Sequence, residues 1–184
     1  GLKNEVGCYL SHMKCLKKFI NESEKDWLLV LEDDVNFVST TNAELPAILS
    51  GLSSLEWDIC YFGHHLTLDS QQDAELFQYY NDSIQTTHSY AINGHVLPEL
   101  ITFLEMVLSR ESGDPRGGPM HFDGAITTFR AQNPTIKTLV LCEALTYQRS
   151  SKTDIHDLRW FDKLPVIRQC VGLLRRIKNI LKAK

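Results

Sequence analysis

Three consecutive carboxylates, Glu32, Asp33 and Asp34, interrupt the apolar segment LLVLEDDVNF at Leu28–Phe37. Adjacent like charges repel, so such a cluster is tolerated either in water, as a surface turn or a helix start, or around a cation. Carboxylate oxygens select hard cations such as Mg²⁺ and Mn²⁺, which commonly bind through one or two carboxylates and substrate phosphates. The triplet therefore indicates metal-assisted chemistry at a phosphate group, and taken alone it leaves the solvated turn open.

The elements around the triplet predict where it lies. Hydrophobic periodicity predicts a helix over residues 4–21, and the apolar run Trp27–Leu31 predicts a strand buried on both faces, as in a mostly parallel sheet. Further predicted elements are helices over 42–52, 98–110 and 122–130, strands over 57–62, 76–80, 84–92 and 136–141, a turn at Asn81-Asp82 and a loop over 111–119. This alternation favours an α/β sandwich, in which ligands bind beyond the carboxyl ends of strands. The triplet falls at such an end.

The length of 184 residues and the apolar and charged fractions of 43% and 23% fit one soluble globular domain. The five cysteines are an odd number without a C-x-x-C pair, so we expect reduced thiols in a cytosolic protein rather than disulfides or a zinc site. Dinucleotide-binding, P-loop, esterase and zincin functions lose their usual support, since none of their motifs occurs.

Charge divides the chain at about residue 162. Residues 163–184 carry seven of the 19 basic residues and no acid, so residues 1–162 have a net charge of −11. Such an acidic body is a poor nucleic-acid binder. From Val166 to Leu181 apolar residues recur at helical spacing, which predicts a basic amphipathic helix that either contacts an anionic membrane surface or packs on the acidic body. We therefore expect a domain over 1–162 and a separate tail helix.

Two segments carry a resemblance to a known family. EVGCYLSHMKCLKKF at Glu5–Phe19, followed closely by LLVLEDDV at Leu28–Val35, resembles glycosyltransferase family 25, the lipopolysaccharide and collagen galactosyltransferase-like group. The family pattern is a G-C-x-x-S-H helix followed by an L-E-D-D-V strand end. Weaker similarity continues in WDICYFG at 57–63, HSYAING at 88–94, GPMHFDGAI at 118–126 and TYQRSSKTDIHD at 146–157.

The resemblance implies a GT-A-like, Rossmann-like mixed sheet flanked by helices and a UDP-sugar as donor. In such enzymes the acidic motif holds Mn²⁺ or Mg²⁺, which stabilises negative charge on the departing diphosphate. We expect Asp34 and Glu32 to be metal ligands, with Asp34 the principal one, and Asp33 to reach the ribose or the sugar.

The resemblance also implies a reaction that inverts the anomeric centre, which requires a base. Asp123 is the candidate for that base, and its alternative role is to cap the helix that begins there. His121 is a candidate further metal ligand, or a packed side chain. His12 and Ser11 are candidates to bind the diphosphate or support the acidic turn, or simply a helix-packing pair.

Other residues are weaker candidates. Tyr90 and Gln148 are candidates for substrate contacts. Two further candidates are weaker still. His64-His65 follow a predicted strand and are candidates to line the site, and Arg116 lies in the Gly-Pro loop and is a candidate to contact phosphate.

Members of this family normally begin with a further segment that contains the first strand of the nucleotide-binding half, so we expect part of the N-terminal half to be missing here. The expected function is metal-dependent, inverting transfer of a hexose, galactose above others, to a glycan or lipid-linked glycan such as lipopolysaccharide. The expected localisation of the protein is cytoplasmic, as a peripheral protein on the inner face of the membrane. The alternatives are a non-catalytic glycan- or membrane-binding remnant of the same fold and a metal-dependent phosphoryl hydrolase.

Overall fold

A computed structural model describes residues 2–22, 26–68 and 75–149. The helices are α1 (Leu2–Glu22), α2 (Thr41–Ser54), η2 (Gly94–Val96, 3-10), α3 (Leu97–Ser109) and α4 (Phe122–Gln132), and the strands are β1 (Trp27–Leu31), β2 (Val35–Phe37), β3 (Ile59–Tyr61), β4 (Phe77–Tyr79), β5 (Ser89–Asn93), β6 (Thr138–Leu141) and β7 (Thr146–Gln148). The boundary at residue 162 and the tail helix over 163–184 lie outside the described residues.

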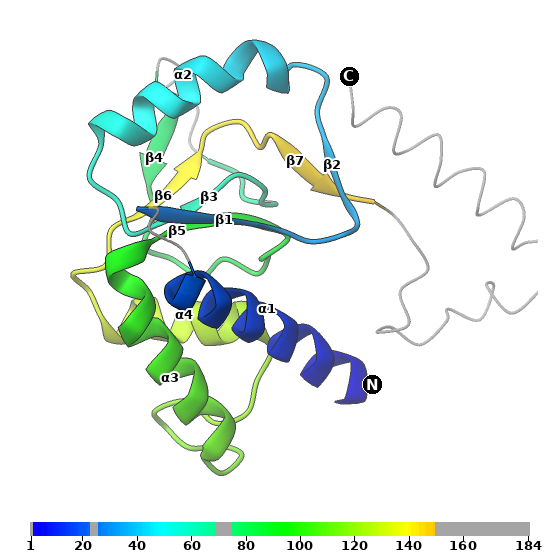
Figure 1. Cartoon of the computed structure of the whole chain (residues 1–184), viewed down its shortest axis with the longest axis vertical. Helices are drawn as coiled ribbons and strands as arrows, with labels where there is room; N and C mark the ends of the chain where they lie inside the picture. Colours follow the sequence, from blue (N-terminus) through cyan, green and yellow to red (C-terminus); the bar gives the residue numbers. More distant parts are fainter. Residues whose placement is uncertain (1, 23–25, 69–74, 150–184) are drawn as a thin grey trace, which may run out of the picture.

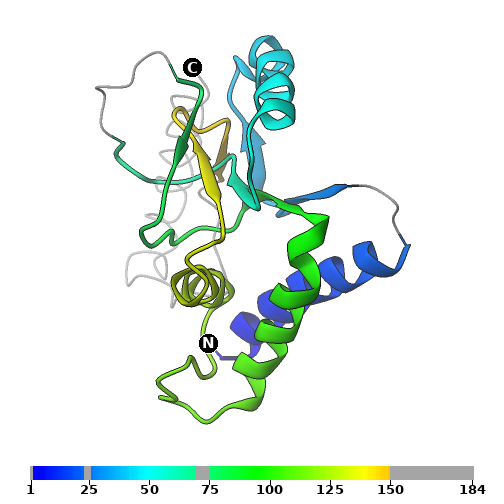
Figure 2. The same ribbon diagram turned by 90° about the vertical axis from the view of Figure 1, so that its left-hand side faces the viewer.

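Five strands form one sheet between two layers of helices. Their order is β1-β5-β3-β6-β4, with β3 and β6 parallel and the other neighbours antiparallel. Helix α2 covers one face, and α1, α3 and α4 cover the other (Figure 1). Figure 2 shows α1 and α3 side by side with α4 seen end-on next to them. The expected Rossmann-like mixed sheet flanked by helices is confirmed.

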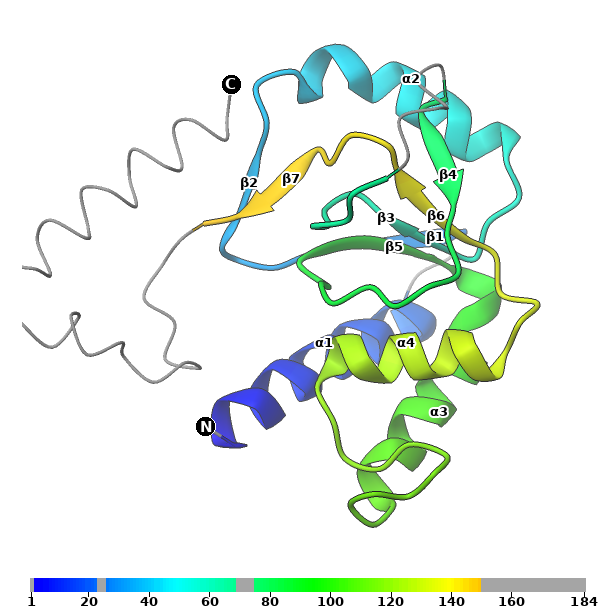
Figure 3. The same ribbon diagram turned by 180° about the vertical axis from the view of Figure 1, so that it is seen from behind.

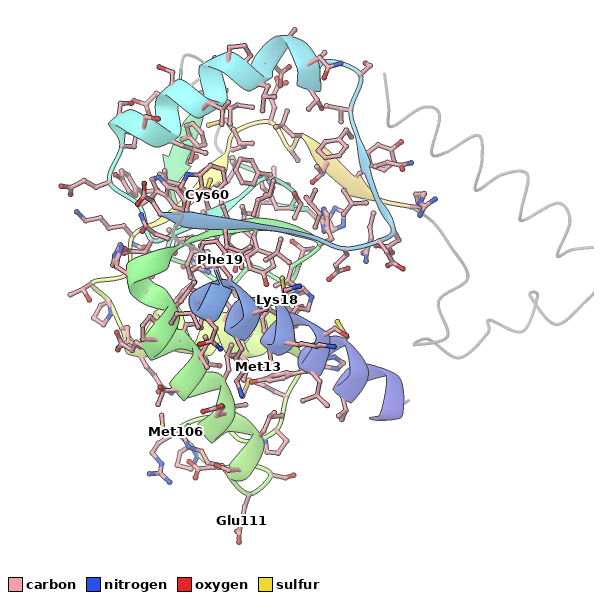
Figure 4. The ribbon with its side chains drawn as sticks, in the orientation of Figure 1. Met13, Lys18, Phe19, Cys60, Met106 and Glu111 are labelled. Atoms are coloured by element: carbon pink, nitrogen blue, oxygen red, sulfur yellow. The ribbon has the colours of Figure 1, made fainter. Side chains whose placement is uncertain are left out.

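Side-chain alternation in the strands fills the two cores. In β3, Ile59 and Tyr61 face α1, α3 and α4, whereas Cys60 faces the α2 layer, and all three are fully buried. On α1, Met13 lies on the buried face below the sheet that contains Cys60 (Figure 4). The loop after α3, which carries Glu111, projects away from the sheet (Figure 4). Of the two hydrophobic cores, the one between the sheet and α1, α3 and α4 is the larger.

The strand that leads into the acidic triplet differs from the prediction. β1 is an edge strand paired antiparallel with β5, not a strand buried on both faces of a mostly parallel sheet. Val30 is buried against the helices, but Leu29 and Leu31 are each 43% exposed on the opposite face. The fully buried strands are β3 and β6. An apolar run cannot distinguish a central strand from an edge strand, because it does not encode whether a helix covers its second face.

A second difference concerns the strand expected over 84–92. β5 begins only at Ser89, and it does not neighbour β4 in the sheet, so Asn81-Asp82 does not join two paired strands. Ile84 is buried, but its backbone N–H and C=O both meet the Thr127 hydroxyl, at 3.4 and 3.2 Å. A side chain from α4 thus takes the place of a neighbouring strand at this position.

The sequence did not predict the two-stranded sheet of β2 and β7. Val35 pairs with Gln148 and Phe37 with Thr146, so the chain just after the triplet is joined to residues more than a hundred positions later. Figure 3 shows this ribbon beside the main sheet, on the same side as the N-terminal end of α1. Three-residue strands are too short for a reliable periodic signal.

Candidate active site

The acidic triplet forms the turn between β1 and β2. The Glu32 N–H donates to the His88 carbonyl at 2.9 Å, and the Val35 N–H returns to the Glu32 carbonyl at 3.3 Å. Glu32 and Asp34 are half-buried, while Asp33 is exposed. In Figure 1 this bend lies at the carboxyl end of β1, above the N-terminal half of α1. β1 and β3 run in the same direction, so the triplet does lie at an edge where strands end.

Gln148 joins the two half-buried carboxylates. Its Nε2 donates to Glu32 Oε2 at 3.0 Å and lies 3.4 Å from Asp34 Oδ1. The following residue, Arg149, donates its backbone N–H to the Asp34 carbonyl and its guanidinium to the Asp33 carbonyl, at 3.0 and 2.9 Å. The β2–β7 ribbon thus fixes the backbone of the turn and places the Glu32 and Asp34 carboxylates within reach of the Gln148 side-chain amide.

Asp34 sits in surroundings that disfavour its own charge. Burial raises the pKa of its carboxyl most; the hydrogen bond from Gln148 opposes the rise, while the neighbouring charges of Glu32 and Asp33 add to it. A cation would relieve both the desolvation and the repulsion. Two half-buried carboxylates that converge on one turn therefore fit a hard divalent cation, and Glu32 and Asp34 are the residues that could hold one.

His12 is held from three directions beside Glu32. Its Nε2 lies 3.3 Å from Glu32 Oε1, its Nδ1 lies 2.9 Å from the hydroxyl oxygen of Tyr90, and its ring stacks on Phe122 with centroids 4.2 Å apart. His12 and Tyr90 are buried. The imidazole therefore links the centre of the sheet to the acidic turn, which is a supporting geometry of the kind that orients metal ligands.

Cys8 completes the group, although the sequence pattern did not predict a role for it. It lies one helical turn before His12, and its Sγ, a His12 ring nitrogen and a Glu32 oxygen all lie within 4.8 Å of one another. Burial raises the pKa of the Cys8 thiol, and the charges of Glu32, Asp123 and Asp34 raise it further. The signal in the sequence was the i, i+4 spacing of Cys8 and His12, which places both on one helix face.

Asp123 and His121 flank the start of α4. The Gly124 N–H donates to Asp123 Oδ1 at 2.7 Å, and Asp123 stands in the first turn, where a negative charge is favourable. Its negative charge contributes to the raised pKa values of Cys8 and Tyr61. His121 immediately precedes the helix and is exposed, and its ring nitrogens are outside the one group of close metal-ligand atoms in the described chain.

The remaining candidates lie apart from this cluster or serve other bonds. Ser11 is exposed, and its hydroxyl donates to the Gly7 carbonyl of its own helix at 2.9 Å. His64 is buried and its Nε2 lies 2.7 Å from the Leu141 carbonyl oxygen. Arg116 forms an ion pair with Asp114 at 2.9 Å. The structure thus brings together His12, Glu32, Asp34, Tyr90 and Gln148.

Comparison with known proteins decides the family. The sequence profile described as "Glycosyltransferase family 25 (LPS biosynthesis protein)" matches residues 3–109, which is more than half of the chain. The chain belongs to glycosyltransferase family 25. The matched region of this family 25 member contains Ser11, His12, the acidic triplet and Tyr90, whereas Asp123, His121 and Gln148 lie beyond it.

Two relatives of this family 25 member carry the same name. It is 26% identical to human procollagen galactosyltransferase 2 over 97 residues, which is 52% of this chain and 15% of the human protein. It is 33% identical to the Mus musculus procollagen galactosyltransferase 2 over 63 residues, which is 33% of this chain and 10% of the mouse protein. The match thus spans a small part of each relative's length.

In residues 2–22, 26–68 and 75–149, no helix is both long and apolar enough to cross a bilayer.

Proposed function

We propose that this chain is a glycosyltransferase that moves a hexose, galactose above others, from a UDP-sugar to a glycan acceptor. The observation that carries the proposal is the convergence of Glu32 and Asp34 on Gln148 at the carboxyl end of β1. Family membership and the names of the relatives support a sugar-transfer reaction. Hard oxygen donors at this position suit Mn²⁺ or Mg²⁺ with a nucleotide diphosphate.

We assign different roles in the reaction to different residues of the chain. Asp34 and Glu32 hold the cation, which when bound stabilises the negative charge of the departing UDP. Gln148 keeps the two carboxylates together, and His12 orients Glu32. Asp33, exposed on the same turn, is our candidate contact to the ribose or the sugar. Ser11, Tyr90 and His121 stay weaker candidates for donor or metal contacts.

The proposed chemical step is a single displacement with inversion. The acceptor hydroxyl oxygen forms a bond to the sugar C1, the bond from C1 to the UDP oxygen breaks, and its electron pair stays on UDP. Asp123 takes the proton of the acceptor hydroxyl. The position of Asp123 in the chain supports this role, since the preceding residue, Phe122, stacks on His12 with ring centroids 4.2 Å apart.

The proposed acceptor is a glycan or a lipid-linked glycan such as lipopolysaccharide, which the description of the family supports. The basic sequence from 163 to 184 supports contact with an anionic membrane surface. Together they favour a peripheral position on the cytoplasmic face of the membrane. The net charge of −11 over residues 1–162 argues against a nucleic-acid partner.

The experiment is a thermal melt of the chain with Mn²⁺, with UDP and with both. A ligand at about 100 times its dissociation constant stabilises the folded state by about 2.7 kcal/mol. We expect the thermal midpoint to rise most with both ligands present. Asp34→Asn should abolish this rise. Glu143→Gln, a matched loss of charge at an exposed loop position, should keep it. Transfer from UDP-galactose to truncated lipopolysaccharide or to collagen then tests the acceptor.

Other outcomes favour other functions. UDP-sugar hydrolysis that no acceptor accelerates would favour a phosphoryl hydrolase that uses the same carboxylates. The absence of any rise with Mn²⁺ and UDP would overturn the donor site and favour a non-catalytic glycan- or membrane-binding protein of the same fold.

A further inference from the structure

The group formed by Cys8, His12 and Glu32 has a different chemistry from the pair Glu32 and Asp34. It offers one sulfur, one imidazole nitrogen and one carboxylate oxygen, all within 4.8 Å of one another. Mg²⁺ and Mn²⁺ prefer oxygen ligands, whereas a thiolate and an imidazole suit a softer ion such as Zn²⁺. Three protein ligands with one open position is the usual arrangement of reactive zinc sites.

We propose that Cys8, His12 and Glu32 form a site for Zn²⁺, with a fourth position open to water. The absence of a C-x-x-C pair predicts reduced thiols rather than a zinc site. The structure differs, because a third ligand arrives from the β1–β2 turn, 20 residues beyond His12.

The spacing of the ligand atoms suits a tetrahedral ion. Zinc bonds of about 2.0–2.3 Å place neighbouring ligand atoms about 3.3–3.8 Å apart. His12 Nε2 and Glu32 Oε1 are 3.3 Å apart, so this edge of the tetrahedron is already in place. Cys8 requires only a short movement of its sulfur, because the three atoms are within 4.8 Å.

The ligands are also held by a second set of contacts. Tyr90 lies 2.9 Å from His12 Nδ1 and Phe122 stacks on the ring, so the plane of the imidazole is fixed. Gln148 donates to Glu32 Oε2 at 3.0 Å, which leaves Oε1 turned toward His12. Contacts of this kind typically raise metal affinity by about 10- to 100-fold.

Binding also requires a defined movement of protons. Coordination through His12 Nε2 places the imidazole proton on Nδ1, where it donates to the Tyr90 oxygen. Cys8 coordinates as the thiolate and releases its proton to water. No oxidant or reductant takes part, so the site stays available as long as the thiol is reduced.

Occupation of this site has a consequence for the hard cation. Glu32 belongs to both sets of ligands, so Zn²⁺ on Cys8 and His12 competes with the hard cation for the negative charge of its carboxylate. Zn²⁺ would then inhibit Mn²⁺-dependent transfer. This consequence rests on the proposed function, whereas the binding of Zn²⁺ does not.

The first test is titration of the reduced full chain with Co²⁺, which reports thiolate coordination through a near-ultraviolet charge-transfer band, followed by displacement with Zn²⁺. We expect one equivalent to bind. Cys8→Ser and His12→Asn should abolish the band, and Tyr90→Phe should weaken Zn²⁺ binding by about 10- to 100-fold. Cys15→Ser is the matched control, since Cys15 is a free, half-buried thiol two turns later on the same helix.

The two sites are separated by Asp34→Asn. This change should leave the Co²⁺ band intact, while it removes the stabilisation by Mn²⁺ with UDP. If no band forms, or if the band persists in Cys8→Ser, the zinc site is wrong. Circular dichroism spectra of each variant will show whether the loss of a band reflects the loss of the fold. Glu32→Gln provides an independent ligand variant if Cys8→Ser does not fold.

Discussion

Gln148 Nε2 lies 3.0 Å from Glu32 Oε2, although the two residues are 116 positions apart in the chain. The same nitrogen lies 3.4 Å from Asp34 Oδ1. A single amide from β7 therefore holds together the two carboxylates to which we assign the cation. The register of the β2–β7 ribbon makes this possible, because it pairs Gln148 with Val35, next to Asp34.

Replacement of Gln148 by Leu tests this support. We expect the free energy of unfolding in chelator to fall by about 1 kcal/mol, below the range of about 1.5–3 kcal/mol for hydrogen bonds to charged groups, because these side chains are partly exposed. Urea denaturation is the measurement, with the exposed Gln85→Leu as the matched control. An unchanged free energy would mean that the amide does not offset the repulsion between the carboxylates.

Asp123→Asn separates the two roles considered for Asp123. The asparagine oxygen can still accept the Gly124 N–H, so the free energy of unfolding should fall by no more than about 1 kcal/mol, the most that loss of a negative charge from an exposed first helical turn usually costs. Loss of a general base should lower the transfer rate by about 10²- to 10⁴-fold.

The matched control is Glu99→Gln, an exposed acid in the first turn of α3, which should keep the rate. If Asp123→Asn retains full activity, Asp123 only stabilises the start of α4.

Gly63 tests the packing directly behind the site. A Cβ at this position would lie 2.1 Å from His88 Nε2 and 2.3 Å from Thr146 Oγ1, and both side chains are buried. We therefore expect Gly63→Ala to lower the free energy of unfolding by about 1–3 kcal/mol. Gly7→Ala should raise it by about 0.5–1 kcal/mol, because Gly7 is helical and nothing lies within 4 Å. Denaturation curves that moved in the same direction for both variants would contradict this.

Stability should depend on pH through His64. Burial lowers the pKa of His64 from its ordinary value, and the nearby His65 also lowers it, while the hydrogen bond to the Leu141 carbonyl opposes the change. The unfolded chain therefore binds a proton more readily than the folded chain below about pH 6.5, so the stabilising effect of neutral His64 is complete above that pH and is lost as the pH falls.

The measurement is the slope of the unfolding free energy between pH 7.5 and 5.5, values set about one unit to either side of the histidine range. His64→Gln keeps a donor for the Leu141 carbonyl and should make the slope shallower. His65→Gln, at the exposed neighbouring position, is the matched control. An equal slope in His64→Gln and the unmodified chain would show that His64 does not couple folding to pH.

Several features could be predicted because their signals are local. The apolar periodicity of residues 4–21 predicted a helix, and α1 extends over Leu2–Glu22 with Tyr9, Met13 and Leu16 buried at helical spacing. The strand over 27–31 was predicted to the residue. A helix of this length repeats its pattern over several turns, so the buried face can be recognised without knowledge of its partner.

The sequence by itself determined the helices and the position of the acidic triplet at a strand end. It also determined the family pattern that contains both His12 and Glu32. Only the tertiary structure decided that β1 is an edge strand, that Gln148 meets both carboxylates and that Cys8 faces Glu32. The reason is physical. Local patterns record which face of an element is buried, whereas strand order and the contacts between distant residues depend on how all the elements pack at once.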